Sequence, residues 1–204
     1  MNYFKLKYFI PFCLIFVLSC SKDDNTSSEN QSETEIQGNW MTYCYLNDND
    51  SNTWKYEKNT ININNSDFEL KKEFFSNINC LSRTVTITEH FSNLQIGQEV
   101  TYESGNVGKK FTYDVVSFKR VVHTESLVNN YNSWIYCGFN DWVLNQIKDY
   151  TGQSCGNSNP TFYPVKNTTI FNQYLLYGNN LKLGPNSSSN YPNKVNNTPI
   201  YIKQ

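Results

Sequence analysis

Alanine, the strongest helix former, is missing from all 204 residues of the chain. Charge is scarce as well: Asp, Glu, Lys and Arg together make up 17% of the residues, and the formal net charge is -1. Proteins that bind nucleic acid along a broad groove need a surplus of positive charge. The composition therefore argues against a helix-rich fold and against nucleic acid as a partner.

The sequence also lacks the motifs that nucleotide-binding proteins and many hydrolases carry. No Gly-x-Ser-x-Gly occurs, and the segment 105–110 lacks the spacing and the Ser or Thr of a phosphate-binding loop. The two histidines, His90 and His123, stand apart in strand-like segments, and no Cys-x-x-Cys accompanies them. We therefore expect no metal, no cofactor and no Ser-His-Asp triad.

Carboxylates are the catalytic option that remains. Two of them about 5 to 9 Å apart could hydrolyse a glycoside, but the sequence pairs none of the candidates. Scattered surface carboxylates are the simpler interpretation, so we expect no enzyme and keep a carboxylate-dependent glycoside hydrolase as the third hypothesis. The candidate residues are Glu89, Glu99, Glu103, Asp114, Asp141 and Asp149.

Aromatic residues supply 16% of the chain, and asparagine occurs 31 times. Short segments of alternating apolar and polar residues recur between clusters of turn-forming residues, a pattern typical of half-buried strands. We expect an all-β, mainly antiparallel domain whose meander closes into a barrel, with a β-sandwich as the alternative. The predicted strands cover residues 38–46, 54–63, 68–74, 81–90, 94–103, 110–124, 168–177, 181–183 and 199–203.

Two segments carry more detailed expectations. In 81–90, the alternation puts Leu81, Val85 and Ile87 on one face and the threonines on the other. In 140–150, Val143, Ile147 and Tyr150 share one face of a helix. The second segment predicts one short helix, with a strand as the competing interpretation.

The first 35 residues differ from the rest of the chain. Lys5 and Lys7 precede an apolar run at 8–18, which is shorter than the about 20 residues of a membrane-spanning helix and is typical of a signal peptide. Residues 21–35 contain no apolar or aromatic side chain and cannot form a core. We therefore expect a signal peptide at 1–19, a lipidated flexible tether at 20–35 and a single β-barrel domain at 36–204.

The apolar run ends in Val17-Leu18-Ser19-Cys20, which resembles a bacterial lipobox. In lipoproteins of that class the signal is cut before the cysteine, and the cysteine receives acyl chains such as palmitate. Two or more acyl chains anchor a protein stably to a membrane. The resemblance implies that Cys20 is the lipid-attachment residue and that a membrane is a partner. An ordinary secretory signal is the alternative.

Charged residues follow this cysteine directly. Lys22, Asp23 and Asp24 complete a Cys-Ser-Lys-Asp-Asp run that resembles the lipoprotein export signal of the Bacteroidota. The resemblance implies attachment to the outer membrane and display at the cell surface. The periplasmic face of that membrane is the alternative.

Four cysteines lie beyond the signal and Cys20, namely Cys44, Cys80, Cys137 and Cys155. An even number in an exported chain indicates two disulfides. Three pairings are possible. We favour Cys44 with Cys80 and Cys137 with Cys155, because each pair then stays within its own half of the domain.

Gly38-Asn39-Trp40, at the head of the first predicted strand, resembles the Gly-x-Trp opening of lipocalin-like barrels. The strand order is also similar to that of small secreted bacterial lipocalin-like lipoproteins. In that family the tryptophan closes the narrow end of an up-and-down barrel. The resemblance implies that Trp40 closes one end and that Gly38 lets the chain enter. The Thr-Asp-Tyr element of true lipocalins is absent, and the last strand offers Lys203 rather than Arg.

A second aromatic cluster surrounds Cys137. Exposed rings could stack on sugars or line an apolar pocket, whereas buried rings would only fill the barrel. Our leading hypothesis is a lipid-anchored exported protein that is not an enzyme and binds a small apolar ligand or a glycan at the barrel mouth. The alternative is a structural or protein-interaction module with a filled barrel. The candidate ligand-binding residues are Trp134, Tyr136, Phe139 and Trp142.

Overall fold

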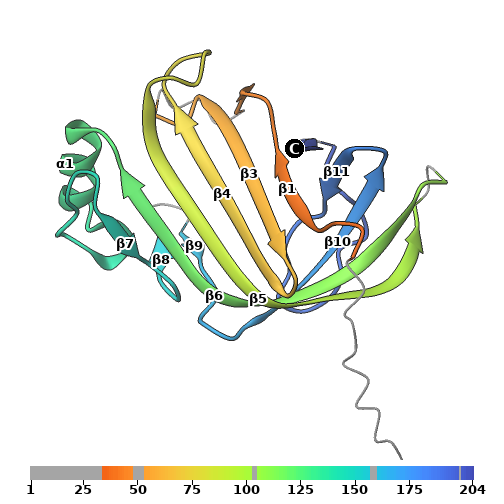
Figure 1. Cartoon of the computed structure of the whole chain (residues 1–204). Helices are drawn as coiled ribbons and strands as arrows, with labels where there is room; N and C mark the ends of the chain where they lie inside the picture. Colours follow the sequence, from red (N-terminus) through yellow and green to blue (C-terminus); the bar gives the residue numbers. More distant parts are fainter. Residues whose placement is uncertain (1–33, 48–52, 103–104, 157–159, 198) are drawn as a thin grey trace, which may run out of the picture. The chain divides into compact units, whose positions relative to one another are not determined.

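The main sheet closes on itself (Figure 1). The computed structural model describes residues 34–47, 53–102, 105–156, 160–197 and 199–204. Our predictions for the signal peptide, for Cys20 and for Lys22, Asp23 and Asp24 lie outside the described residues. The closed ring runs in the order β3 (Tyr56–Asn64), β4 (Asp67–Phe75), β5 (Arg83–Thr101), β6 (Val107–Val122), β10 (Thr169–Tyr177), β11 (Asn180–Leu183), β12 (Tyr201–Lys203) and β1 (Gly38–Met41), which pairs with β3 again.

Every pairing around this ring is antiparallel, and most strands pair with the next strand along the chain. β2 (Tyr45–Leu46) adds to β3, and β7 (Ile147–Asp149) adds to β6. β8 (Ser154–Cys155) and β9 (Thr161–Phe162) form a separate pair. The prediction of an all-β, lipocalin-like up-and-down barrel is confirmed. The β-sandwich alternative fails because a ring of strands leaves no second, separate layer.

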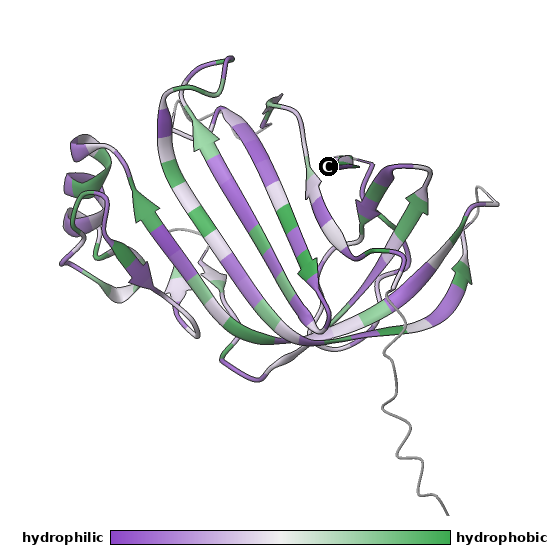
Figure 2. Cartoon of the chain, in the orientation of Figure 1, coloured by the Kyte–Doolittle hydropathy of each residue, from purple (hydrophilic) through white to green (hydrophobic). Residues whose placement is uncertain are grey.

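Alternation along the strands builds the interior, as the banded colouring of β3, β4 and β5 in Figure 2 shows. In β3, Ile61 and Ile63 are buried, whereas Asn62 and Asn64 are exposed. The predicted turn after Asn64 joins β3 to β4, and Asn65 adopts there the positive φ of 54° that asparagine tolerates better than most residues.

The two strands predicted at 81–90 and 94–103 are a single strand, β5. Its pairing with β6 shifts register between His90 and Phe91 and at two further points, and Asn93 has a positive φ. These irregularities are β-bulges, which bend a strand without ending it. The polar residues around Asn93 had suggested a break because bulges and turns favour the same residue types.

The expectation that Leu81 shares one strand face with Val85 and Ile87 is wrong. Leu81 is 78% exposed, whereas Val85 and Ile87 are buried. The strand begins only at Arg83, and the preceding loop is held by the Asn77 side chain. Its Oδ1 accepts hydrogen bonds from the backbone N–H groups of Leu81 and Ser82. That loop geometry turns Leu81 toward solvent.

The helix predicted at 140–150 is also misplaced. The helix of this region is α1 (Glu125–Ser133), which buries Leu127, Val128 and Tyr131. The segment 140–150 forms a turn and then β7, which pairs with the end of β6 and exposes Ile147. A free strand edge thus outweighs the helical spacing of 140–150. Among the described residues no helix is long and apolar enough to cross a membrane.

β1 closes the ring between β12 and β3. Its Trp40 is 1% exposed and donates its indole N–H to the backbone oxygen of Ile36 at 2.9 Å. Across the seam, Lys203 pairs with Trp40 and holds its Nζ 5.3 Å from the centre of the indole ring. Lys203 thus supplies a cation over this ring, a contact that stabilises by about 0.5–2 kcal/mol. Gly38 has a φ of 113°, which side-chain-bearing residues rarely adopt.

The first described residues attach to the end of the barrel that carries the β3–β4 turn. The Gln37 amide donates to the backbone oxygen of Asn65 and accepts from its N–H. Glu35 accepts hydrogen bonds from Lys109 Nζ at 2.9 Å and from the Tyr174 hydroxyl at 2.8 Å. Burial raises the pKa of Glu35, but these two donors outweigh burial and lower it overall. The chain therefore enters the barrel at a fixed point.

Aromatic rings fill the interior at this end. Phe68 lies 5.3 Å from Phe91 and 5.1 Å from Tyr113, measured between ring centres, and Phe111 lies 5.3 Å from Tyr113. All four rings are almost fully buried. Packed rings of this kind leave no room for a ligand between them.

Both predicted disulfides are confirmed. Cys44 pairs with Cys80, and Cys137 pairs with Cys155. The first ties the segment after β1 to the loop between β4 and β5, and the second ties η1 (Tyr136–Gly138) to β8. Each disulfide therefore holds an irregular segment against a strand or a loop.

Candidate binding cavity

A cavity of about 750 Å³ lies inside the barrel, at the end opposite the chain entry. The side chains that line it come from the C-terminal ends of β1 and β11, the N-terminal ends of β3 and β12, and the middle of β4. The lining residues are Thr42, Tyr43, Tyr45, Leu46, Asn47, Glu57, Asn59, Leu70, Lys72, Leu183, Gly184, Pro185, Asn186, Asn196, Pro199, Ile200 and Tyr201.

The strand period explains why polar groups reach this interior. Glu57 and Asn59 share a face of β3 with Ile61 and Ile63, and Lys72 shares a face of β4 with Phe68 and Leu70. The inward face of β3 thus changes from apolar to polar along its length. Apolar residues fill the entry end, and polar residues surround the cavity.

Lys72 forms an ion pair with a carboxylate just beyond the lining. Its Nζ donates to Glu89 Oε1 at 2.6 Å, and Glu89 is 5% exposed. Burial lowers the pKa of Lys72, but the Glu89 carboxylate outweighs burial and raises it overall. The ammonium group therefore stays charged, and Glu89 balances its charge.

Glu57 has no such cation. It is 9% exposed, and Asn47 Nδ2 donates to its Oε2 at 2.8 Å. Within the part of the chain that the structure describes, no Lys, Arg or His lies within ion-pair distance of it. Burial and the Glu57 carboxylate together raise the pKa of Tyr45, so this hydroxyl stays neutral. The cavity wall thus carries a carboxylate that forms no direct ion pair with a described cation, and its charge helps to raise the pKa of Lys72.

Asn59 lines the cavity beside Glu57. It is 2% exposed, its Nδ2 donates to the Tyr45 hydroxyl at 3.0 Å, and its backbone N–H donates to Thr42 Oγ1 at 2.8 Å. Its side-chain oxygen Oδ1 accepts no hydrogen bond and has almost no accessible surface. This oxygen therefore lies behind the cavity wall and is not in contact with the open space.

The floor of the cavity is held by a polar cluster on β6, β10 and the segment after β11. Asn186 Oδ1 accepts from the Tyr113 hydroxyl and from Asn172 Nδ2, both at 2.6 Å. Burial raises the pKa of Tyr113, which keeps its hydroxyl a donor. The polar groups of this cluster are paired with one another and are therefore less available to a ligand than Glu57 is.

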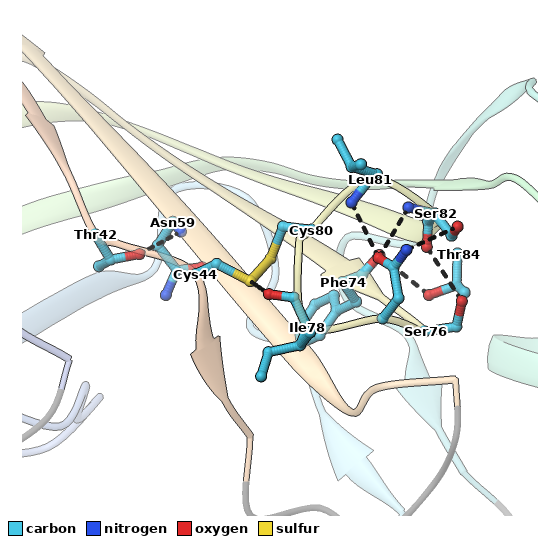
Figure 3. Close-up of a disulfide and its surroundings, with 11 residues drawn as sticks. Thr42, Cys44, Asn59, Phe74, Ser76, Ile78, Cys80, Leu81, Ser82 and Thr84 are labelled. Carbon is cyan, nitrogen blue, oxygen red and sulfur yellow. Dashed lines mark hydrogen bonds between the residues drawn. A yellow bond between two sulfur atoms is a disulfide. The ribbon is translucent and has the colours of Figure 1, made fainter.

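The Cys44–Cys80 disulfide lies beside the cavity mouth, and Figure 3 shows it with Thr42 and Asn59 on its β1–β3 side. Tyr43 and Leu46 flank Cys44, line the cavity and are 78% and 58% exposed. The disulfide fixes the segment that carries these two rim residues.

An insertion between β6 and β10 covers the neighbouring part of the same end. Its aromatic residues surround Arg120, which projects from β6 and is 2% exposed. The guanidinium carbon lies 4.9 Å from the ring centres of Tyr136 and Tyr150, 5.5 Å from Trp54 and 5.8 Å from Tyr131. No described carboxylate forms an ion pair with Arg120. These rings therefore hold the insertion on the barrel.

The four aromatic residues that we proposed from sequence as ligand-binding belong to this insertion and do not line the cavity. Trp142 is 2% exposed and packs 6.1 Å from both Tyr136 and Phe139, measured between ring centres. Trp134 is 50% exposed at the end of α1. Their place in the structure indicates packing between insertion and barrel.

The candidate catalytic carboxylates are scattered. Glu89 is the buried one, and Asp114 and Asp141 are exposed and paired with Asn93 and Lys148. Glu103 lies outside the described residues. Within the described ranges, no three His, Cys, Asp or Glu side chains gather to hold a metal ion.

Histidine does not reach the cavity. His123 lies between Thr86 Oγ1 at 2.9 Å and Asn145 Oδ1 at 2.8 Å, which joins β5 to the turn before β7.

The sequence analysis did not identify the cavity residues Glu57, Asn59 and Lys72 as candidate site residues. The period of two along this strand could have indicated the first two, because Glu57 and Asn59 lie on the same face as the buried Ile61 and Ile63.

No protein-family model matches this chain, and a search of curated proteins finds no match to it.

Proposed function

We propose that this chain is an exported, lipid-anchored protein that is not an enzyme and binds a small molecule inside its barrel. The cavity of about 750 Å³ carries this proposal, because inward-facing polar side chains converge on it and one of them, the Glu57 carboxylate, forms no ion pair with a described cation. Small-molecule sites are typically concave, of about 300–1,000 Å³, with a few converging polar groups.

The lining favours a ligand with polar groups over a purely apolar one. Glu57, Asn59 and Lys72 surround the space, and tyrosines and leucines complete the wall. An apolar ligand would cover these groups without pairing them, which costs about 1–3 kcal/mol for each neutral group and more for a charged one. A ligand that pairs with them avoids this cost.

The N-terminal sequence supports an anchor at Cys20. The Cys-Ser-Lys-Asp-Asp run that begins at Cys20 favours the outer membrane and the cell surface as the location. The described chain begins at the end with the β3–β4 turn, and the cavity opens at the other end of β1 and β3.

Filling the cavity tests the binding role. We expect Leu183→Trp, which adds a large ring at a lining position, to abolish retention of a small molecule. The full chain is purified from cells, denatured, extracted and analysed by mass spectrometry. Leu81→Trp, at an exposed position outside the lining, is the matched control. A molecule that wild type and the control retain and Leu183→Trp lacks supports the proposal. Equal extracts from all three proteins would instead favour a barrel that acts as a structural module.

The anchor has its own test. We expect Cys20→Ser to move the full chain from the membrane fraction to the soluble fraction, because serine cannot accept the thioether-linked lipid. Cys13→Ser makes the same substitution within the predicted signal peptide and should leave the chain on the membrane. Fractionation followed by immunoblotting measures both. Membrane association that survives Cys20→Ser would refute the lipobox interpretation.

A further inference from the structure

Glu57 is the one carboxylate among the residues that line the cavity, and it forms no ion pair with a described cation. Asn47 Nδ2 donates a hydrogen bond to its Oε2 at 2.8 Å. The one cationic side chain of the lining, Lys72, is already paired with Glu89 at 2.6 Å. Arg120, a buried cation at the same end of the barrel, is not part of the lining and is enclosed by aromatic rings. Glu57 is therefore the charged group of the lining with which an incoming cation can pair.

Aromatic rings complete this environment. Tyr43, Tyr45 and Tyr201 line the same cavity, and a ring face attracts a cation within about 6 Å of its centre. Leu70 and Leu183 provide apolar surface for the body of a ligand. Burial raises the pKa of Tyr201, so this residue presents a neutral ring and hydroxyl.

From these residues we infer that the ligand is a small organic cation with N–H donors and an aromatic or aliphatic body, held by Glu57. The inference rests on the proposed binding function. The ammonium group of the ligand donates to the Glu57 carboxylate. Charge-assisted hydrogen bonds of this type are about twice as strong as neutral ones. Anions are disfavoured because the cation of the lining, Lys72, is already paired with Glu89.

Three indole compounds that differ mainly in charge test the inference. Tryptamine is a cation, tryptophol is neutral and indole-3-acetate is an anion. Isothermal titration calorimetry with the full chain in detergent measures the Kd of each. We expect tryptamine to bind at least about tenfold tighter than either analogue, since one charge-assisted contact in a buried site has about that effect.

Glu57→Gln keeps the shape of the side chain and removes its charge. We expect it to weaken tryptamine at least about tenfold and to leave tryptophol unchanged within about twofold. Glu69→Gln is the matched control, because Glu69 lies on the exposed face of β4. Circular dichroism verifies that each variant is folded. The comparison of the three indole compounds on the wild-type protein tests the inference even if a variant does not fold.

Several outcomes would overturn the inference. These are equal or tighter binding of tryptophol or indole-3-acetate, an unchanged Kd for tryptamine in Glu57→Gln, or no binding of all three compounds. If the Leu183→Trp experiment nevertheless finds a retained molecule that depends on the cavity, the proposed binding function stands and only the ligand class fails. If that experiment finds none, both fail.

Discussion

Arg120→Ala is expected to lower the free energy of unfolding by about 3 kcal/mol, because it removes a large, fully buried side chain from a close-packed cluster of rings. Four ring centres lie within 5.8 Å of its guanidinium carbon, and a desolvated cation over a ring stabilises by up to about 2 kcal/mol. The substitution also removes the cost of burying the guanidinium charge, which offsets part of the lost stability. Equilibrium unfolding in guanidinium chloride measures the difference.

Arg83→Ala is the matched control for this prediction. Arg83 lies on the same sheet, its side chain is 45% exposed, and it pairs with Glu73 at 2.9 Å. Surface ion pairs contribute about 0–1 kcal/mol, so its loss should have a small effect. Arg120→Met keeps most of the volume without the charge and should fall between the two. An effect of Arg120→Ala no larger than that of Arg83→Ala would show that the cluster does not hold the insertion.

The double substitution Cys44→Ser/Cys80→Ser is expected to lower the free energy of unfolding by about 4 kcal/mol. The disulfide closes a sequence separation of 36 residues, and such a cross-link stabilises mainly by restricting the unfolded chain. The second disulfide closes a sequence separation of only 18 residues. Its removal by Cys137→Ser/Cys155→Ser should therefore lower the free energy of unfolding by about 3 kcal/mol. Unfolding curves of the oxidised proteins give both values.

Two results would count against this account of the disulfides. The first is a loss below about 1 kcal/mol for the Cys44–Cys80 pair, which would mean that the cross-link restricts little. The second is the detection of free thiols at these four positions in the folded protein, which would contradict the pairing itself. Thiol titration before and after denaturation tests the second point directly.

Much of the barrel could be predicted because its strands obey a period of two. Ile61 and Ile63 alternate with asparagines, and the turn after Asn64 separates two strands that pair in register. The cysteine pairing could be predicted because each pair stays within its own half of the domain. Strand alternation and turns depend on only a few neighbouring residues, so both can be recognised in the sequence alone.

The errors arose where contacts between distant segments decided the structure. β5 continues through the polar residues around Asn93 because β6 pairs along both sides of the bulge. The 140–150 segment forms β7 because the end of β6 offers it an edge. Such tertiary pairing overrides local spacing, and a single sequence does not reveal the partner.

The candidate site shows the same limit. Alternation alone placed Glu57 and Asn59 on the inward face of their strand, but it did not indicate that Lys72 would be paired with Glu89. That fact depends on the registers of β3 with β4 and of β4 with β5. The aromatic cluster around Cys137 drew attention for its composition, whereas the structure uses it to pack the insertion around Arg120.

A crystal structure of the full chain, purified from cells with no ligand added, tests the binding role most directly. We expect ordered density inside the barrel that belongs to a small molecule and contacts Glu57. A cavity filled by the chain's own side chains would refute the proposed function.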